Sequence, residues 1–100
     1  MNTKEQPNHV DFIVEWEQVK GLSDKGVGWR RDGNRYDLIG YVTYADTNVC
    51  HLSVEDNDGV FCTYVFAFPF AKHHAEQIIG TEQYFVFDRS FYCWWLPNMI

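Results

Sequence analysis

The sequence predicts a mainly β domain, a β-barrel of five or six strands with one short α-helix. Five segments alternate apolar and polar residues with a period of two, which is typical of strands that bury one face. Clusters of Asn, Asp and Gly between segments favour turns. Residues 71–79 instead place their apolar side chains at helical spacing. Apolar residues on both sides of the segment 60–68 favour a closed or half-closed barrel.

One domain accounts for most of the chain. Its 100 residues are 46% hydrophobic and 18% aromatic, a composition that argues against disorder and can supply one small core. Residues 1–8 are polar and contain one proline, so we expect a flexible N-terminal arm there. Residues 9–100 are expected to form the single domain.

The first strand is expected at residues 9–21, where Val10, Phe12, Val14 and Trp16 occupy alternate positions. A loop rich in Gly and Asp follows at 22–34. Further strands are predicted at 35–45, 49–55, 60–68, 82–88 and 90–95. Gly40 lies inside the strand 35–45 and suggests a bend or a bulge.

The motif "DNDG" at residues 56–59 predicts a hairpin, since Asn, Asp and Gly tolerate a positive φ. If Glu55 pairs with Val60, side-chain alternation divides the hairpin into two faces. The predicted core face carries Cys50, Leu52, Val54, Phe61, Val65 and Ala67. The predicted outer face carries His51, Ser53, Cys62, Tyr64 and Phe66. A slip of one residue in this register would reverse the assignment.

The cysteines predict free thiols rather than a disulfide framework. There are three, an odd number, and they form no CxxC motif. Cys50 and Cys62 fall on opposite faces in the assumed register. The start of the chain has no signal-peptide pattern, and no apolar run reaches transmembrane length. We therefore expect a cytoplasmic protein that is not in a membrane.

Charge is distributed unevenly along the chain. The formal net charge is −6, and residues 1–35 contribute none of it, because six basic and six acidic side chains balance there. Residues 36–100 hold Lys72 and Arg89 against eight carboxylates. Nucleic-acid-binding domains usually carry a basic surface, because phosphate contacts supply much of their affinity. The main basic cluster is "GWRRDGNR" at residues 28–35.

The order of the elements resembles the OB-fold nucleic-acid-binding domains that accompany tRNA synthetases and replicative polymerases. A strand with Gly40 at its centre precedes the run "LSVEDNDG" at 52–59, and the next strand closes on Phe68-Pro69. A helix at 71–79 and a strand at 83–88 follow. The resemblance covers residues 36–90 and implies an OB-like barrel whose helix bridges the third and fourth strands.

In such barrels the second and third strands and the adjoining loops hold the ligand. The resemblance therefore implies a single nucleic-acid strand stacked on aromatic side chains, at about 1–3 kcal/mol per base. The candidate residues of this ligand-binding face are Tyr41, His51, Tyr64 and Phe66. The candidate phosphate or anion contacts are Arg30, Arg31 and Arg35.

Two interpretations of Tyr64 and Phe66 stay open, because the same rings could pack under another strand. His51 and Cys62 are too few for a zinc site, which needs three or four ligands. The pair His73-His74 is typical of a solvated helix face. The chain contains no GxSxG, HExxH or P-loop motif. We therefore expect no catalytic residue, no metal and no cofactor.

Two functions from different classes remain. The first is a non-enzymatic module that binds single-stranded nucleic acid through an aromatic strand face. The second is a small acidic protein that occupies a basic site on a partner protein, as anti-restriction, anti-CRISPR and toxin-immunity proteins do. Complementary charge speeds such encounters. Its candidate contacts are Glu55, Asp56 and Asp58. The sequence leaves the oligomeric state open.

Overall fold

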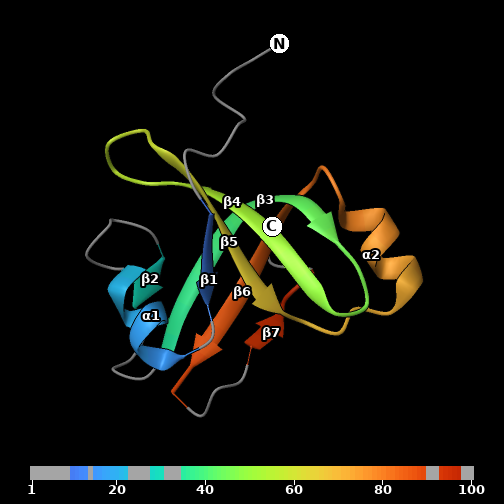
Figure 1. The fold of residues 1–100 in the computed structure, drawn as a ribbon, viewed down its shortest axis with the longest axis horizontal. Helices are drawn as coiled ribbons and strands as arrows, with labels where there is room; N and C mark the ends of the chain where they lie inside the picture. Colours follow the sequence, from blue (N-terminus) through green and yellow to red (C-terminus); the bar gives the residue numbers. More distant parts are fainter. Residues whose placement is uncertain (1–9, 14, 23–27, 31–34, 90–92, 98–100) are drawn as a thin grey trace.

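A computed structural model describes residues 10–13, 15–22, 28–30, 35–89 and 93–97 (Figure 1). Over these residues it contains seven strands and two helices. The strands are β1 (Val10–Ile13), β2 (Trp29–Arg30), β3 (Arg35–Ala45), β4 (Val49–Glu55), β5 (Phe61–Ala67), β6 (Glu82–Asp88) and β7 (Cys93–Trp95). The helices are α1 (Trp16–Gly21) and α2 (Lys72–Ile78). The predicted mainly β fold is confirmed, and the arm predicted at residues 1–8 lies outside the described residues.

The seven strands form one curled sheet. Its order is β1-β5-β4-β3-β6-β7, and β2 pairs with β3 beside this path. The β1–β5 pair is parallel, and the other pairs are antiparallel. The eleven-residue strand β3 is central, because it pairs with both β4 and β6. The sheet has the shape of a half-barrel, with α1 and α2 at opposite ends (Figure 1).

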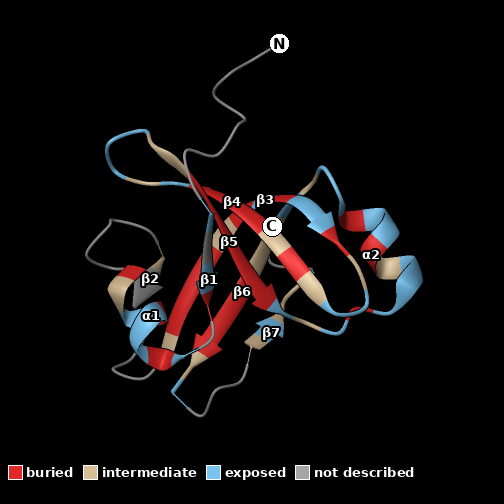
Figure 2. Cartoon of the chain, in the orientation of Figure 1, coloured by how far each residue is buried: buried red, intermediate tan, exposed pale blue. Residues whose placement is uncertain are grey.

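The core lies on the inner, concave face of the sheet. Leu38, Leu52, Tyr64 and Phe85 from four different strands have no exposed surface. Phe66 packs edge-on against Phe85 and Phe87, with both ring centroids 5.1 Å from its own. The helices each contribute buried side chains, so red residues in Figure 2 run from α1 through the strands to α2. Burial of these rings and aliphatic chains is the main force that holds the curled sheet together.

The first predicted strand is shorter than expected, and a helix that the period-two pattern did not predict follows it. β1 ends at Ile13, and α1 begins at Trp16. The backbone N–H of Glu15 donates to Oε1 of Gln18 at 3.2 Å, which stabilises the start of α1. Trp16, Val19 and Leu22 are all buried and recur every third residue. Residues 9–21 also alternate with a period of two, so the helical spacing was not recognised in the sequence.

The β4–β5 hairpin forms, but its register differs by one residue from the prediction. Glu55 pairs with Phe61 and not with Val60. The N–H of Asp56 donates to the carbonyl of Val60 at 2.9 Å. Oδ1 of Asp56 accepts from the N–H groups of Asp58 and Val60, both at 2.9 Å. The carboxylate of Asp56 therefore organises a loop one residue longer than "DNDG".

This slip moves two aromatic rings of β5 into the core. Tyr64 pairs with Leu52 and Phe66 pairs with Cys50, so both rings point to the inner face. Their exposed fractions are 0% and 3%. The prediction that Tyr64 and Phe66 lie on an accessible outer face is wrong, because one residue of register reverses the two faces of a strand.

All three cysteines are free, as predicted. The reason differs from the predicted one, because Cys50 and Cys62 share the inner face. Cys62 pairs with Val54, which lies four residues along β4 from Cys50. That spacing corresponds to about 13 Å along a strand. A disulfide needs Cα atoms closer than about 7 Å, so the two thiols stay apart.

Candidate functional site

Exposed aromatic residues gather on the outer face of the sheet, the side that points away from the core. Tyr41 pairs with Ser53, and Tyr44 pairs with His51 across β3 and β4. Tyr41 is 55% exposed and Tyr44 is 44% exposed. Two of the four predicted ligand-binding residues, Tyr41 and His51, therefore lie on this face, and the other two are core residues.

A β-bulge in β3 brings Tyr44 to the outer face. The pairing with β4 shifts between Val42 and Tyr44, which leaves Thr43 as the extra residue. Strict alternation from Tyr41 would have placed Tyr44 on the inner face. Because the bulge reverses the alternation, Tyr41 and Tyr44 project on the same side of the sheet. Period-two reasoning therefore missed Tyr44. Gly40 suggested a bend or a bulge in this strand, but the register shifts further along, between Val42 and Tyr44.

Tyr44, Asp46 and His51 form a connected polar cluster at the end of β3. The hydroxyl of Tyr44 donates to Oδ2 of Asp46 at 2.8 Å. The rings of Tyr44 and His51 meet edge-on, with centroids 5.2 Å apart. Oδ1 of Asp46 accepts from the N–H groups of Asn48 and Val49 at 2.7 and 2.9 Å. These contacts hold the ring of Tyr44 in a defined position.

The same contacts shift two pKa values in opposite directions. The N–H groups of the turn, together with the Tyr44 hydroxyl, lower the pKa of Asp46. The carboxylate of Asp46 in turn raises the pKa of Tyr44. Asp46 is therefore an anion at neutral pH, and Tyr44 is a neutral hydrogen-bond donor.

Two apolar side chains of β1 extend the outer face. Val10 pairs with Thr63, and Phe12 pairs with Val65, so all four lie on the outer side of the sheet. Val10 is 52% exposed and Phe12 is 63% exposed. We call Tyr41, Tyr44, His51 and Phe12 together the aromatic outer surface. Exposed aromatic and apolar side chains on one face are typical of interaction surfaces.

Carboxylates border the aromatic outer surface. Glu82 pairs with Tyr41 across β6 and β3 and is exposed. Glu55 is exposed two residues beyond Ser53 on the same face of β4. Asp46 lies at the opposite end, beside Tyr44. The side chains that the structure describes include ten carboxylates and four Lys or Arg side chains.

Of the three predicted phosphate contacts, Arg35 has a described side chain, and that side chain is not brought to this surface. Arg31 lies outside the described residues, and only the backbone of Arg30 is described, in β2. The guanidinium of Arg35 lies over the ring of Trp94, 5.5 Å from its centroid. Arg35 begins β3, six residues from Tyr41, a separation of about 20 Å along a strand. It therefore lies apart from the exposed rings of Tyr41 and Tyr44.

The three predicted acidic contacts have different environments at the β4–β5 hairpin. Glu55 and Asp58 are exposed. Asp56 is half-buried and holds the loop through its carboxylate, so its first role is structural. Glu55 and Asp58 are thus the two that a partner can reach directly.

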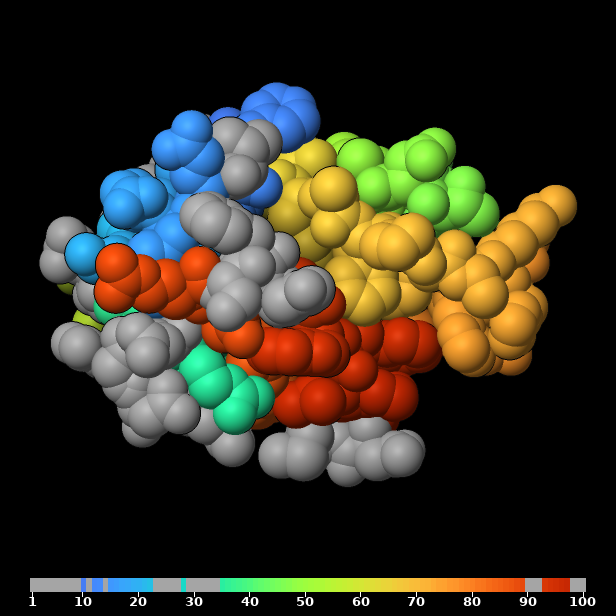
Figure 3. Space-filling view, turned by 90° about the horizontal axis from the view of Figure 1, so that it is seen from below, coloured from blue at the N-terminus to red at the C-terminus, as the bar shows by residue number. Residues whose placement is uncertain are grey.

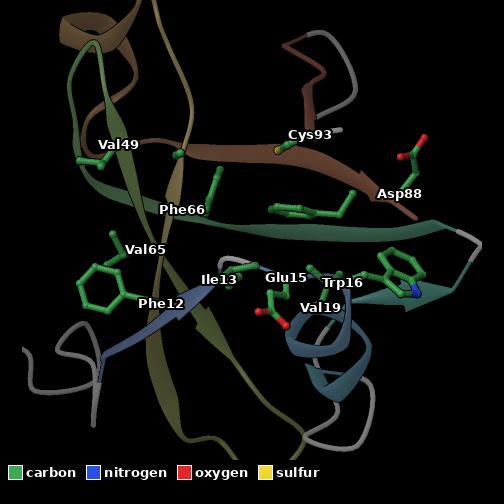
Figure 4. A pocket seen from close by; sticks show the side chains of 12 residues that line it. Phe12, Ile13, Glu15, Trp16, Val19, Val49, Val65, Phe66, Asp88 and Cys93 are labelled. Atoms are coloured by element: carbon green, nitrogen blue, oxygen red, sulfur yellow. The ribbon is translucent and has the colours of Figure 1, made fainter. Parts of the chain in front are cut away.

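A cavity of about 390 Å³ lies at the open side of the half-barrel. Residues of β1, α1, β4, β5, β6 and β7 line it. Figure 3 shows these segments meeting on one side of the molecule, in blue, yellow and orange to red. Figure 4 shows its lining, with Phe12 and Val65 at one end and Trp16 at the other. The lining is mostly apolar, as is usual in small-molecule sites.

Metal ligation and membrane crossing find no support in the described part of the chain. No group of three or more His, Cys, Asp and Glu there is arranged to hold a metal ion. None of the helices in those same ranges has the length and apolar character needed to cross a bilayer.

No protein-family model, no curated protein and no solved structure matches this chain at significant similarity.

Proposed function

We propose that this chain is a non-enzymatic binding module that holds a basic segment of a partner protein on its aromatic outer surface. One observation carries the proposal. Tyr41 and Tyr44 are 55% and 44% exposed on a paired sheet, and the carboxylates of Asp46, Glu55 and Glu82 border them. Aromatic faces attract Arg and Lys by about 0.5–2 kcal/mol per contact. Carboxylates beside the rings add charge complementarity.

The position of the rings favours recognition rather than core packing. They belong to strands that pair on both sides, so their backbone is held in place before a partner arrives. The hydrogen bond from Tyr44 to Asp46 and the contact with His51 restrict the ring of Tyr44 further. Binding to such a surface loses little side-chain entropy, which preserves affinity.

A second candidate is the binding of single-stranded nucleic acid, in line with the OB-fold resemblance. One observation favours it. In the unit β3–β7, α2 connects the third strand, β5, to the fourth, β6, and the exposed rings of Tyr41 and Tyr44 lie on the first strand beside His51 of the second. The charge balance opposes nucleic-acid binding, because the described side chains include ten carboxylates and four basic groups. Phosphates are repelled by such a surface and gain few counterion-releasing contacts.

Fluorescence anisotropy with two labelled probes tests the proposal: a peptide of alternating Arg and Gly, and a single-stranded oligonucleotide. We expect the peptide to bind and the oligonucleotide to bind negligibly. The double variant Tyr41→Ala/Tyr44→Ala should bind the peptide about tenfold more weakly or worse. Glu82→Gln should weaken peptide binding less.

The matched control is Ile79→Ala, which removes another exposed apolar side chain, 43% exposed, at the C-terminal cap of α2. It should leave peptide binding unchanged. Peptide binding that survives loss of both rings would contradict the proposal. Tighter binding of the oligonucleotide, lost in the double variant and weakened by salt, would establish the second candidate instead.

A further inference from the structure

The aromatic outer surface and the cavity meet at Phe12. Cross-strand pairing places four outer-face side chains in one row across four strands: Tyr44 (β3), His51 (β4), Val65 (β5) and Phe12 (β1). Phe12 and Val65 also line the cavity, and Figure 4 shows them beside each other at one end of it. The row therefore leads from Tyr44 to the cavity.

The cavity reaches the outer face because β1 ends before β5 does. The last described pair of these two strands joins Ile13 to Phe66, one residue before the end of β5 at Ala67. Ala67 pairs with Val49, and both line the cavity from the outer side of the sheet. Phe66 and Trp16 are buried and line its inner part. The cavity thus connects the outer face with the core.

The inner part of the cavity is an apolar environment. Its volume of about 390 Å³ lies at the lower end of the range for ligand pockets, about 300–1,000 Å³, and can take one aromatic side chain. Phe66 packs against Phe87 with ring centroids 5.1 Å apart, so neighbouring rings hold this wall in place. Burial raises the pKa of the Cys93 thiol in the lining, so the sulfur stays protonated and adds no charge.

The length of the row sets the spacing of groups that could use both places. Neighbouring strands lie about 4.8 Å apart, so three strand spacings separate Tyr44 from Phe12 by about 14 Å. An extended chain covers this distance with about four residues. Side chains four residues apart project on the same side of an extended chain. One extended segment can therefore place one side chain on Tyr44 and another in the cavity.

We propose that the basic partner segment carries an aromatic side chain about four residues from an Arg or Lys, and that this ring enters the cavity past Phe12 while the cation lies on Tyr44. The inference rests on the proposed function, because it names a second feature of the same segment. Aromatic side chains buried in a pocket are typical hot spots of protein interfaces. The anchor distinguishes such a segment from other basic segments.

Fluorescence anisotropy with peptides of alternating Arg and Gly tests the anchor. Each peptide has one added terminal residue, Phe or Ala, separated by three Gly from the nearest Arg, and all carry the same number of Arg. Because the row allows either chain direction, the added residue is placed at the N-terminus in one pair of peptides and at the C-terminus in the other. We expect one Phe peptide to bind about tenfold more tightly than its Ala counterpart.

Variants locate the ring. Ala67→Trp places a large side chain in the lining from an exposed position, and it should remove the advantage of the Phe peptide without weakening the Ala peptide. Ala71→Trp adds the same side chain at an exposed position outside the lining and should preserve the advantage. The double variant Tyr41→Ala/Tyr44→Ala should weaken both peptides. Thermal melting of each variant checks that it is folded.

The outcomes separate this inference from the proposed function. Equal binding of the Phe and Ala peptides, in both chain directions, would overturn the anchor and leave the proposed function standing. An advantage of Phe that survives Ala67→Trp in a folded protein would place the ring elsewhere and contradict the assignment. If none of the peptides bound, the proposed function would be wrong, and the inference would fall with it.

Discussion

The inner and outer faces of β3, β4 and β5 carry the same kinds of side chain in opposite environments. On the inner face, Tyr64 and Phe66 are 0% and 3% exposed. On the outer face, Tyr41 and Tyr44 are 55% and 44% exposed. The four rings belong to β5 and β3, which lie on either side of β4 in one sheet. Residue type therefore does not distinguish them. The register of the strands decides which rings support the fold and which remain available to a partner.

The largest expected effect comes from the inner face. Phe66→Ala should lower the free energy of unfolding by about 3–5 kcal/mol, because it leaves a cavity beside Phe85 and Phe87. Tyr41→Ala on the outer face should change it by less than about 0.5 kcal/mol. Urea denaturation monitored by circular dichroism measures both.

Phe66→Ala can remove much of the stability of a small domain. Phe66→Leu is a milder change, and it should lower the free energy of unfolding by less. Comparable losses in Phe66→Leu and Tyr41→Ala would mean that the two faces do not differ as described.

A smaller effect is expected where the inner face has no room for a side chain. A Cβ on Gly40 would lie 2.5 Å from the carbonyl oxygen of Ser53 and 2.9 Å from Cγ2 of Val54. Gly40→Ala should therefore cost about 1–3 kcal/mol, because β3 and β4 must move apart. Differential scanning calorimetry of the variant measures the loss.

Gly21→Ala is the matched control, since a Cβ on Gly21 in α1 meets no atom within 4 Å. It should be neutral or slightly stabilising, because alanine favours a helix. If Gly40→Ala were as stable as Gly21→Ala, the close approach of β3 to β4 would be wrong.

The smallest effect is expected from the polar cluster of the outer face, and it depends on pH. The turn N–H groups lower the pKa of Asp46 in the folded state. Its carboxylate therefore stabilises the fold above the unfolded-state pKa of about 3.9, and this contribution is lost as the pH falls through the lower folded-state value. Asp46→Asn should thus be less stable than the natural protein at pH 7, and the difference should shrink toward pH 3.

Denaturation curves between pH 3 and pH 7 measure this difference. Thr47→Ala changes a neighbouring exposed side chain that does not ionise, so its effect should not vary with pH. A stability difference for Asp46→Asn that stays constant over the range would show that the charge of Asp46 does not matter.

Local pattern predicted most of the strands well. The segments 35–45, 49–55 and 82–88 coincide with β3, β4 and β6, and the helix expected at 71–79 is α2 at Lys72–Ile78. These elements have unambiguous periodicity, and Asn, Asp or Gly residues mark several of their ends. The segment 9–21 failed because Trp16 and Val19 fit either a strand or a helix until the rest of the core is present.

The candidate site was less predictable than the fold. Tyr41 and His51 were identified from alternation along single strands, and both lie on the outer face. Tyr44 was missed because the bulge at Thr43 depends on how β3 meets β4. The cavity was not foreseen at all, because its lining comes from six elements that meet only in the folded chain.

The sequence by itself determined the β class, the acidic balance and the presence of more aromatic rings than a small core can hide. These properties are local or additive, so they can be read without knowing which residues meet. Tertiary structure alone decided the faces. A loop one residue longer at Asp56 turned Tyr64 and Phe66 inward, and a bulge at Thr43 turned Tyr44 outward. The physical reason is that a strand alternates with a period of two, so each one-residue change in pairing exchanges core and surface.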